Sequence, residues 1–385
     1  MPDYDRAPWG YFDHAATSPL RPEVRACLLD ALHRGGWGNP SSAHGAGRAA
    51  SRLIEEAREH VAASLGGDPR RLTFYSGATE ANHAGLMALG QRAQQSRDMV
   101  IFASPIEHPS VLGALHRLQT QGFRIHWAEV NDHGQVEAEI ADVVKSIRPL
   151  FLVCMAANNE TGVIQPWKRW AEIGLAAGCP IHVDATQWWG KWSSKDDLPV
   201  LGNWVVSAHK RGALSGVGAM HSSGIALEGW LGDGPQERGR RGGTENLLGL
   251  LALGEVARLG VDADPRWTGL LQAELQEVPG LQFTGTADGR LPSHLHLQLP
   301  VRADLVLQRL DLEGFAVSSG SACSSGSLQP SRVLLAMGWS EEQARCALRV
   351  STGWTNSHED VTAFAAALKD VLGDLQSMTR GEELT

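Results

Sequence analysis

Short apolar segments alternate with longer amphipathic segments between residues 72 and 210, and this alternation constrains the fold more than any other feature. The apolar segments are Leu72–Tyr75, Met99–Ala103, Arg124–Ala128, Phe151–Met155 and the starts of Ile181–Gln187 and Val205–Lys210. Strands that alternate with helices in this way form parallel crossovers. We therefore expect a doubly wound α/β protein with a largely parallel sheet, to which Val217–His221 adds a returning strand.

The remaining segments predict helices and a smaller α+β region. Helices are expected at Pro22–Leu32, Ala46–Leu65, 78–92, 109–121, Glu137–Ile147, Trp167–Ala177, Leu247–Leu259, Trp267–Val278, Ala303–Leu312 and His358–Leu375. Strands are expected at Leu281–Phe283 and His294–Leu299. We predict a large domain over residues 13–255. Residues 1–12 and 256–385 would form a small domain.

Composition excludes several classes of function. The chain has 385 residues, a net charge of −9 and no run of basic residues, which argues against nucleic acid as a partner. It also lacks an apolar run of about 18 residues, so we expect no membrane association and a cytoplasmic location. The five cysteines form no C-x-x-C pair, so neither a disulfide framework nor a metal site is expected.

Polar residues follow two of the predicted strands. Asp184 and Gln187 follow one strand, and Ser207, His209 and Lys210 follow the other. Ligands of an open α/β sheet bind beyond the carboxyl ends of its strands, so these side chains should share one crevice. A lysine that can form a Schiff base and an aspartate that can pair with a pyridine nitrogen are the two groups that pyridoxal phosphate (PLP) requires. The alternative is an ordinary Asp–Lys ion pair.

Two further segments fit a phosphate and a ring. Ser76-Gly-Ala-Thr79 joins a strand directly to a helix, and the first amides of a helix favour an anion. The alternative is a plain helix cap with Glu80 in the first turn. His108 follows another strand and either lies over a ring or faces solvent, the latter being slightly favoured by sequence alone.

Two other polar segments are less specific. Residues 238–246 (Arg-Gly-Arg-Arg-Gly-Gly-Thr-Glu-Asn) predict a mobile, cationic loop suited to anion contact or a subunit interface, or simply a solvated turn. His294 and His296 share one face of a strand and could bind a metal. Without a third ligand, a half-exposed strand is the preferred interpretation.

Cys323 stands in a segment of small residues, Phe315-Ala-Val-Ser-Ser-Gly-Ser-Ala-Cys-Ser-Ser-Gly-Ser-Leu-Gln-Pro330. A structural cysteine is normally surrounded by apolar residues, so this one is predicted to be an exposed nucleophile on a flexible loop. A plain Ser/Gly linker is disfavoured because the segment lies between a predicted strand and a helix. Arg349, on a later strand, is suited to bidentate binding of a carboxylate.

Taken in order, ten motifs resemble one enzyme family. They are Asp13-His-Ala-Ala-Thr, Gly38-Asn-Pro-Ser-Ser-Ala-His44, Ser76-Gly-Ala-Thr-Glu80, Glu107-His108, Asn158-Asn-Glu-Thr-Gly162, His182-Val-Asp-Ala-Thr-Gln187, Ser207-Ala-His-Lys210, Arg241-Gly-Gly-Thr244, Ser318-Ser-Gly-Ser-Ala-Cys323 and Leu348-Arg349. The chain resembles the cysteine desulfurases of the NifS/IscS-like group, which are class V, fold-type I PLP enzymes. This resemblance implies a mostly parallel seven-stranded sheet in the large domain. Ala208 and the tryptophans at 188 and 189 depart from the usual pattern.

The resemblance also implies a role for each matching residue. Lys210 would be the Schiff-base lysine, Asp184 the partner of the pyridine nitrogen, and His108 the residue that stacks on the ring and shuttles protons. Gln187 would contact the ring hydroxyl. The phosphate would be held by Ala78, Thr79, Ser207 and His209, with Thr244 reaching across from the second subunit of a homodimer. Asn159 and Arg349, with Asn39 nearby, would bind the substrate carboxylate.

The implied activity is the conversion of L-cysteine to L-alanine, with PLP as cofactor. Cys323 would carry the sulfur as a persulfide and pass it to an acceptor protein, for iron–sulfur cluster, thio-cofactor or tRNA biosynthesis. Two other enzyme activities remain open: a selenocysteine lyase, which shares nearly all of the chemistry, and a class V aminotransferase, which does not need Cys323. The alternative outside catalysis is a desulfurase-like scaffold for a sulfur-transfer partner.

Overall fold

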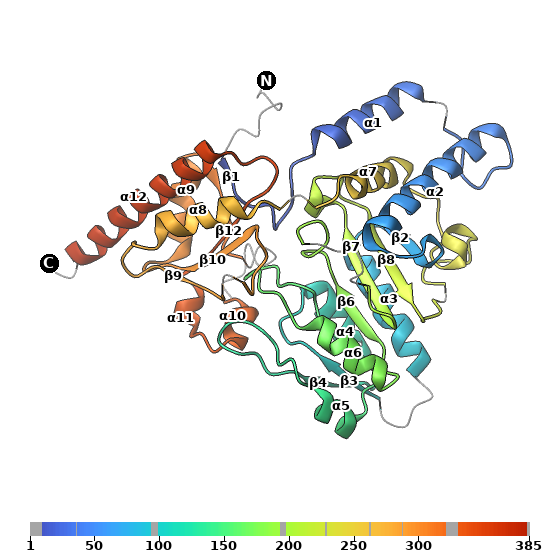
Figure 1. The fold of residues 1–385 in the computed structure, drawn as a ribbon, viewed down its shortest axis with the longest axis horizontal. Coiled ribbons are helices and arrows are strands. Elements are labelled where there is room, and N and C mark those ends of the chain that lie inside the picture. Colours follow the sequence, from blue (N-terminus) through green and yellow to red (C-terminus); the bar gives the residue numbers. More distant parts are fainter. Residues whose placement is uncertain are drawn as a thin grey trace.

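The computed structural model describes residues 10–35, 37–93, 99–192, 198–227, 229–261, 263–286, 288–320 and 330–382. Cys323 therefore lies outside the described residues. Within them, a seven-stranded sheet forms the centre of the larger part of the molecule (Figure 1). Its order is β2 (Leu72–Tyr75), β8 (Gly218–Ser223), β7 (Gly202–Ser207), β6 (Ile181–Asp184), β5 (Phe151–Val153), β3 (Val100–Ala103) and β4 (Arg124–Trp127).

The directions of these strands confirm the expected topology. β8 runs antiparallel to both of its neighbours, β2 and β7. The pairs from β7 through β6, β5 and β3 to β4 are all parallel. The mostly parallel sheet of seven strands is thus confirmed, as is the returning strand after Lys210.

Helices cover both faces of this sheet, because alternate residues of each strand point to opposite sides. Ile101 and Ala103 pack with α3 (Ala78–Ala93) and α4 (Pro109–Thr120). Phe102, between them, packs in another buried cluster with α6 (Trp167–Ala176). The same cluster includes residues of α1 (Pro22–Arg34), α2 (Gly45–Leu65) and α7 (Leu247–Arg258). Burial on both faces explains why the strands read as continuous apolar runs.

One predicted helix is shorter than its apolar spacing suggests. We expected Glu137–Ile147, but α5 covers only Ala141–Ile147. The carbonyl of Glu137 accepts a hydrogen bond from the indole of Trp170 (2.8 Å), and its amide donates to Glu129 O (3.1 Å). These tertiary hydrogen bonds replace the first turn of the helix.

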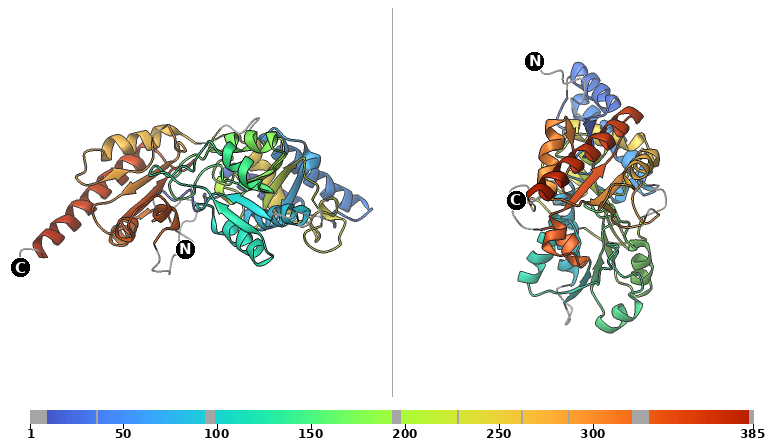
Figure 2. Two further views of the ribbon diagram at one scale, coloured as in Figure 1. Left: turned by 90° about the horizontal axis from the view of Figure 1, so that it is seen from below. Right: turned by 90° about the vertical axis from the view of Figure 1, so that its left-hand side faces the viewer.

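A second, antiparallel sheet has the order β12 (Ala347–Ser351), β10 (His294–Gln298) and β9 (Gln282–Phe283). It packs with α8 (Pro265–Leu275), α9 (Ala303–Leu312) and α12 (His358–Glu382), and α12 projects beyond the rest of the fold (Figure 2). Beside it, β1 (Gly10–Tyr11) pairs with β11 (Phe315–Ala316). Short helices α10 (Arg332–Ala336) and α11 (Glu341–Ala344) precede β12. The domain boundaries at residues 13 and 255 stay a prediction.

The two histidines of β10 are not half-exposed as predicted. Both His294 and His296 have no exposed surface. Burial holds the pKa of His296 at about 3, and its Nδ1 lies 2.8 Å from the hydroxyl of Thr284. The preferred interpretation failed because β10 is the central strand of its sheet, covered on both faces. Among the described residues, no three metal-binding side chains gather in one place.

The arginine-rich segment after β8 is held by specific contacts and is not a free cationic loop. Glu237 is buried and binds both terminal nitrogens of the buried Arg58 (2.7 and 2.8 Å), and it also accepts from the amide of Phe74. Arg238 pairs with Glu55, and Arg241 pairs with Glu80 (3.1 and 3.0 Å). Carboxylates of α2 and α3 thus pair with Arg238 and Arg241, whereas Arg240 donates to Arg70 O and to the hydroxyl of Thr73. The mobility of this loop stays a prediction.

Removing one partner of this buried pair should destabilise the protein strongly. Glu237→Ala removes the buried partner of Arg58 and leaves it only the partly exposed carboxylate of Glu55 (3.0 Å), so we expect the free energy of unfolding to fall by about 3–5 kcal/mol. Urea denaturation measures this loss. The matched control is Asp374→Ala, which breaks an exposed pair with Arg309 and should cost less than about 1 kcal/mol. Equal losses in both variants would contradict a structural role for the buried pair.

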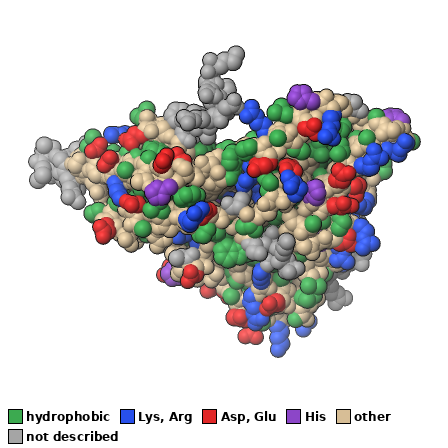
Figure 3. Space-filling view, turned by 45° about the horizontal axis from the view of Figure 1, so that its top comes forward, with side chains coloured by type: hydrophobic (Ala, Val, Ile, Leu, Met, Phe, Trp, Pro, Cys, Tyr) green, Lys and Arg blue, Asp and Glu red, His purple; other side chains and the backbone are tan. Residues whose placement is uncertain are grey.

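On the face shown in Figure 3, acidic and basic side chains are interspersed. No helix in the described part of the chain is long and apolar enough to cross a membrane.

Candidate active site

A pocket of about 640 Å³ opens at the carboxyl ends of β6 and β7. Its walls also include the start of α3, the start of α4, and Arg349 of the second sheet. Polar groups collect there because strands ending in polar residues must deliver them to water or to a ligand. The pocket therefore lies at the edge of the large sheet that the sequence indicated.

Most of the predicted site residues line this one pocket. They are Ala78, Thr79, His108, Asn159, Asp184, Gln187, Ser207, His209, Lys210 and Arg349. Two predicted residues, Asn39 and Thr244, are exposed and do not belong to its described lining. Cys323 falls in the segment 321–329, outside the described residues.

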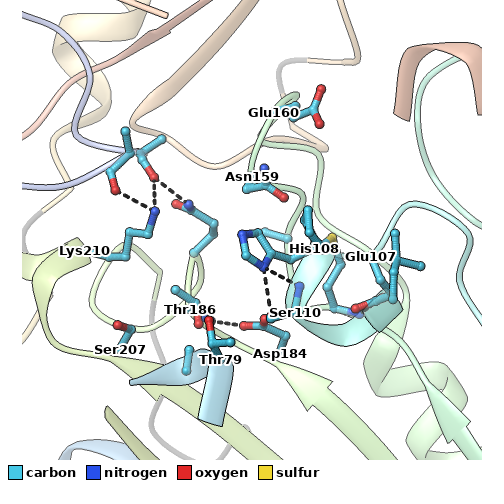
Figure 4. Close-up of a pocket in the computed structure, with 18 of the residues that line it drawn as sticks. Thr79, Glu107, His108, Ser110, Asn159, Glu160, Asp184, Thr186, Ser207 and Lys210 are labelled. Carbon is cyan, nitrogen blue, oxygen red and sulfur yellow. Dashed lines mark hydrogen bonds between the residues drawn. The ribbon is translucent and has the colours of Figure 1, made fainter. Parts of the chain in front are cut away.

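Asp184 is an almost buried carboxylate at the end of β6. Its Oδ2 accepts a hydrogen bond from Asn82 Nδ2 (2.8 Å). Its Oδ1 accepts from the amide of Thr186 (3.0 Å), which lies beside it in Figure 4. A carboxylate only accepts hydrogen bonds, and each oxygen has a second lone pair to offer. Asp184 can therefore accept a further hydrogen bond from a protonated ring nitrogen.

Lys210 follows β7 on a short 3-10 helix, η2 (His209–Arg211). Its Nζ donates to the carbonyls of Ala15 and Ala16 (2.7 Å each), which belong to the segment after β1. Gln187 Nε2 donates to the same carbonyl of Ala15 (2.9 Å). The lysine amine and the glutamine amide are thus positioned together by one stretch of backbone.

His108 is half-buried and lines the pocket, so the expectation of a solvent-facing side chain is wrong. It is the N-cap of α4, and its Nδ1 accepts from the amide of Ser110 (3.1 Å). Burial lowers the pKa of His108; Asp184 opposes this shift and Lys210 adds to it. The ring is therefore neutral near pH 7, with its proton on Nε2.

The start of α3 provides an anion site. The first amides of this helix have no carbonyl partner within it, and the helix dipole favours a negative charge there. β8 can run directly behind this turn because residue 218 is glycine: a Cβ there would come within 2.7 Å of Gly77 C. The capping alternative also holds in part, since Glu80 accepts from the amide of Ser76 (2.7 Å).

His209 lies at the end of β7, beside Lys210. Burial, together with the positive charges of Lys210 and Lys191, lowers its pKa to about 4. A neutral histidine can still donate one hydrogen bond to a phosphate oxygen.

Arg349 is buried on β12, and its guanidinium faces the pocket from the second sheet. One terminal nitrogen donates to Asn159 O (2.7 Å), and the other binds the Asp13 carboxylate (2.6 Å). Its Nε has no hydrogen-bond partner in the described part of the chain. Such a planar fork, held on two sides, suits recognition of a substrate carboxylate.

Sequence reasoning missed four buried polar residues around this pocket. Lys191 Nζ donates to Gln187 Oε1 (2.6 Å), and burial lowers the pKa of Lys191 well below its ordinary value. Burial likewise raises the pKa of Glu107, which accepts from the amide of Met155 (2.5 Å). The other two, Asn82 and Ser110, are hydrogen-bonded to each other (3.0 Å). Asn82 and Ser110 lie within predicted helices, whereas Glu107, quoted above only as part of a motif, and Lys191 lie outside every predicted element, so no shared pattern in the sequence identifies the four.

These groups fit pyridoxal phosphate. Asp184 offers an acceptor for a ring N–H, and Lys210 offers an amine for the aldehyde carbon. The helix start at Ala78 and the side chains of Ser207 and His209 offer donors for a phosphate. The donor and acceptor set therefore matches each polar part of this cofactor.

Comparison with known proteins gives a consistent result. The aminotransferase class-V family matches residues 10–364. The cysteine desulfurase IscS of Dictyoglomus turgidum is 34% identical over 96% of each chain. A solved structure of a NifS-like protein superposes with a TM-score of 0.84 at 28% identity, covering 94% of this chain and 99% of that one. The NifS-like protein from Rickettsia africae gives 0.81 at 28% identity, covering 94% and 98%.

Proposed function

Because the chain belongs to the NifS/IscS-like cysteine desulfurases of the aminotransferase class-V family, we propose that it converts L-cysteine to L-alanine and carries the sulfur on Cys323. The cofactor of this family is pyridoxal phosphate. The observation that carries the proposal is the pocket in which Asp184, Lys210 and His108 meet Arg349. These are the groups needed for the cofactor ring, its aldehyde, proton transfer and the substrate carboxylate.

Bound pyridoxal phosphate supplies an electron sink that weakens the bonds around Cα and Cβ of an attached amino acid. Asp184 would accept a hydrogen bond from the ring nitrogen and would so favour the protonated ring, which draws electrons more strongly. Lys210 would hold the cofactor through its side-chain amine. His108, neutral with its proton on Nε2, holds a proton at the pocket side.

Arg349 and Asn159 bind the substrate carboxylate and so orient the side chain of the substrate toward Cys323. The thiolate of Cys323 forms a bond to the substrate sulfur while the carbon–sulfur bond of the substrate breaks. The carbon keeps the electron pair and gains a proton, so alanine leaves and a persulfide remains on Cys323. Only the thiolate is nucleophilic, so Cys323 must lose its own proton first.

Each site is proposed to be shared between two subunits of a homodimer. Thr244 is exposed and is not among the described residues that line the pocket of its own chain. A phosphate carries up to two negative charges, whereas a helix N-terminus supplies only about half a positive charge. Donors from a second chain would make up the difference. A shared site of this kind is isologous, with two identical pockets per dimer.

The persulfide is proposed to pass to an acceptor protein in the cytoplasm. Four of the cysteines lie in the described part of the chain, and all four are free thiols. Thiol chemistry of this kind requires a compartment in which cysteines stay reduced. Cys323 would then be regenerated after each transfer.

A comparison of three substrates tests the proposed activity. We expect kcat/KM for cysteine to exceed that for alanine with a keto acid by at least about a thousand-fold, because a transaminase makes no use of Cys323. Sulfide and alanine should appear in equal amounts under reducing conditions. Selenocysteine preferred over cysteine would indicate a lyase for that substrate. A wild-type protein that binds no cofactor and turns over none of the three would favour the scaffold alternative.

A further inference from the structure

Asn82 is a fully buried side chain on α3, and it contacts three polar groups around the pocket. Its Nδ2 lies 2.8 Å from Asp184 Oδ2 and 3.0 Å from the hydroxyl of Ser110. Its Oδ1 lies 3.0 Å from Nε2 of His182. Every polar atom of this amide therefore has a partner.

The chemistry of these partners fixes the direction of each hydrogen bond. Asp184 can only accept, so the NH₂ group of Asn82 faces it and gives its second hydrogen to Ser110. The amide oxygen must then accept from His182 Nε2. Burial lowers the pKa of His182 to about 4, so that ring is neutral and carries its one proton on Nε2.

The hydroxyl of Ser110 links Asn82 to His108. Its hydroxyl accepts from Asn82, so its own hydrogen points to His108 Nδ1, 2.8 Å away. The amide of Ser110 donates to the same nitrogen (3.1 Å). Figure 4 shows this edge of the ring turned toward Ser110 and the opposite edge turned into the pocket. A nitrogen that accepts two hydrogen bonds cannot take up a proton without losing both.

We propose that Asn82 is a positioning residue that couples the two sides of the cofactor site, holding the Asp184 carboxylate with one hydrogen and, through Ser110, holding His108 neutral with its proton on Nε2. This proposal depends on the proposed function for the roles of Asp184 and His108. The amide of Asn82 thus fixes the position of the Asp184 carboxylate and the protonation state of the His108 imidazole.

Other groups around His108 act on its charge as well. Asp184 on β6 favours the charged ring, and Lys210 disfavours it. Glu107 and His209 contribute little charge, because burial raises the pKa of the first and lowers that of the second to about 4. The N-terminus of α4 favours the neutral ring. Because a lowered pKa keeps His108 neutral above that pKa, removing one donor to Nδ1 should raise the pKa and extend the charged range to higher pH.

Ser110→Ala tests the branch that leads to His108. In the ¹⁵N-histidine-labelled full chain with cofactor, with His108 assigned from His108→Gln, the wild type should carry its proton on Nε2. We expect the pKa of His108 to rise by about 0.5–1 unit in Ser110→Ala. The acid limb of kcat/KM should move to higher pH by the same amount. Cofactor retention should change by less than about twofold, because Asn82 still binds Asp184.

Asn82→Leu tests both branches at once, with Asn203→Leu as its matched control. Asn203 is equally buried, and its amide donates to Gly85 O and accepts from Ser222 outside the pocket. A hydrogen bond to a charged group contributes a factor of about 10–100, so cofactor should dissociate about 10–100 times faster from Asn82→Leu. Asn203→Leu should lose stability but keep wild-type retention and the wild-type acid limb.

Three results would overturn the proposal. They are a wild-type His108 protonated on Nδ1, an unchanged pKa of His108 in Ser110→Ala, and equal cofactor loss from Asn82→Leu and Asn203→Leu. If Asn82→Leu does not fold, the pKa of His108 in Ser110→Ala still tests the proposal. The histidine spectra of the full chain can also be read without added cofactor. A failure of the proposed desulfurase activity is therefore distinguishable from a failure of the proposed role of Asn82 and Ser110.

Discussion

Cys323→Ser should abolish sulfur transfer, with cysteine-dependent sulfide release falling on the order of 10³-fold or more. A serine hydroxyl stays protonated near pH 7 and does not attack sulfur, whereas a thiolate does. The visible absorption of the bound cofactor should be unchanged, because Lys210 and Asp184 remain in place. Sulfide release under reducing conditions and the absorption spectrum are the two measurements.

Cys346→Ser is the matched control for this prediction. Cys346 is a half-buried free thiol, and burial raises its pKa, so it is poorly suited to act as a nucleophile. Its replacement should leave the rate of sulfide release within about twofold of wild type, as is usual away from a reacting centre. Full activity of Cys323→Ser, or loss of activity in Cys346→Ser alone, would exclude Cys323 as the sulfur carrier.

Lys210→Ala should lose turnover completely. No other described lysine among the pocket-lining residues can attach the cofactor. The protein should therefore bind pyridoxal phosphate only noncovalently, without the absorption of the lysine adduct, while its fold persists. Absorption spectra before and after dialysis, with circular dichroism as the check on folding, measure the effect. Normal turnover in this variant would remove Lys210 from the mechanism.

The same variant tests whether two chains share each site. When Lys210→Ala and Thr244→Ala proteins exchange subunits, a shared site gives heterodimers with one doubly damaged pocket and one intact pocket. Activity and cofactor retention should then partly recover, to at most about half of wild type per heterodimer. No recovery after proven exchange, or a fully active monomer, would show that each chain builds its own site.

The large sheet was predictable because its physical causes are local. Apolar runs buried on both faces give strands that can be recognised without knowing their neighbours. Sequence reasoning failed where a contact between residues far apart in the chain determines the local structure or the burial of a side chain. Glu137 is not helical because its carbonyl accepts a hydrogen bond from the indole of Trp170. His294 is buried because β10 is the central strand of its sheet.

The residues of the candidate site also fall into those that the sequence predicts and those that only tertiary packing brings together. Lys210 and Asp184 were predictable because each ends a strand with a polar side chain, and the motifs assign them. Asn82 and Ser110 lie on two different helices, and only the packing of α3 beside α4 brings their side chains together. Donor and acceptor relations of this kind depend on three-dimensional neighbours, so periodicity in one helix does not reveal them.

The pairing of β1 with β11 has a consequence for protein synthesis. All seven strands of the large sheet lie between residues 72 and 223, so that sheet can form while the chain is still growing. Asp13 and Ala15 must wait for Arg349 and Ser351, with which they form hydrogen bonds. At about 5–20 residues per second, this wait is on the order of tens of seconds. The part of the pocket built from the segment after β1 and from β12 therefore assembles last, and a chain truncated before β12 has Lys210 but lacks Arg349, the proposed site for a substrate carboxylate.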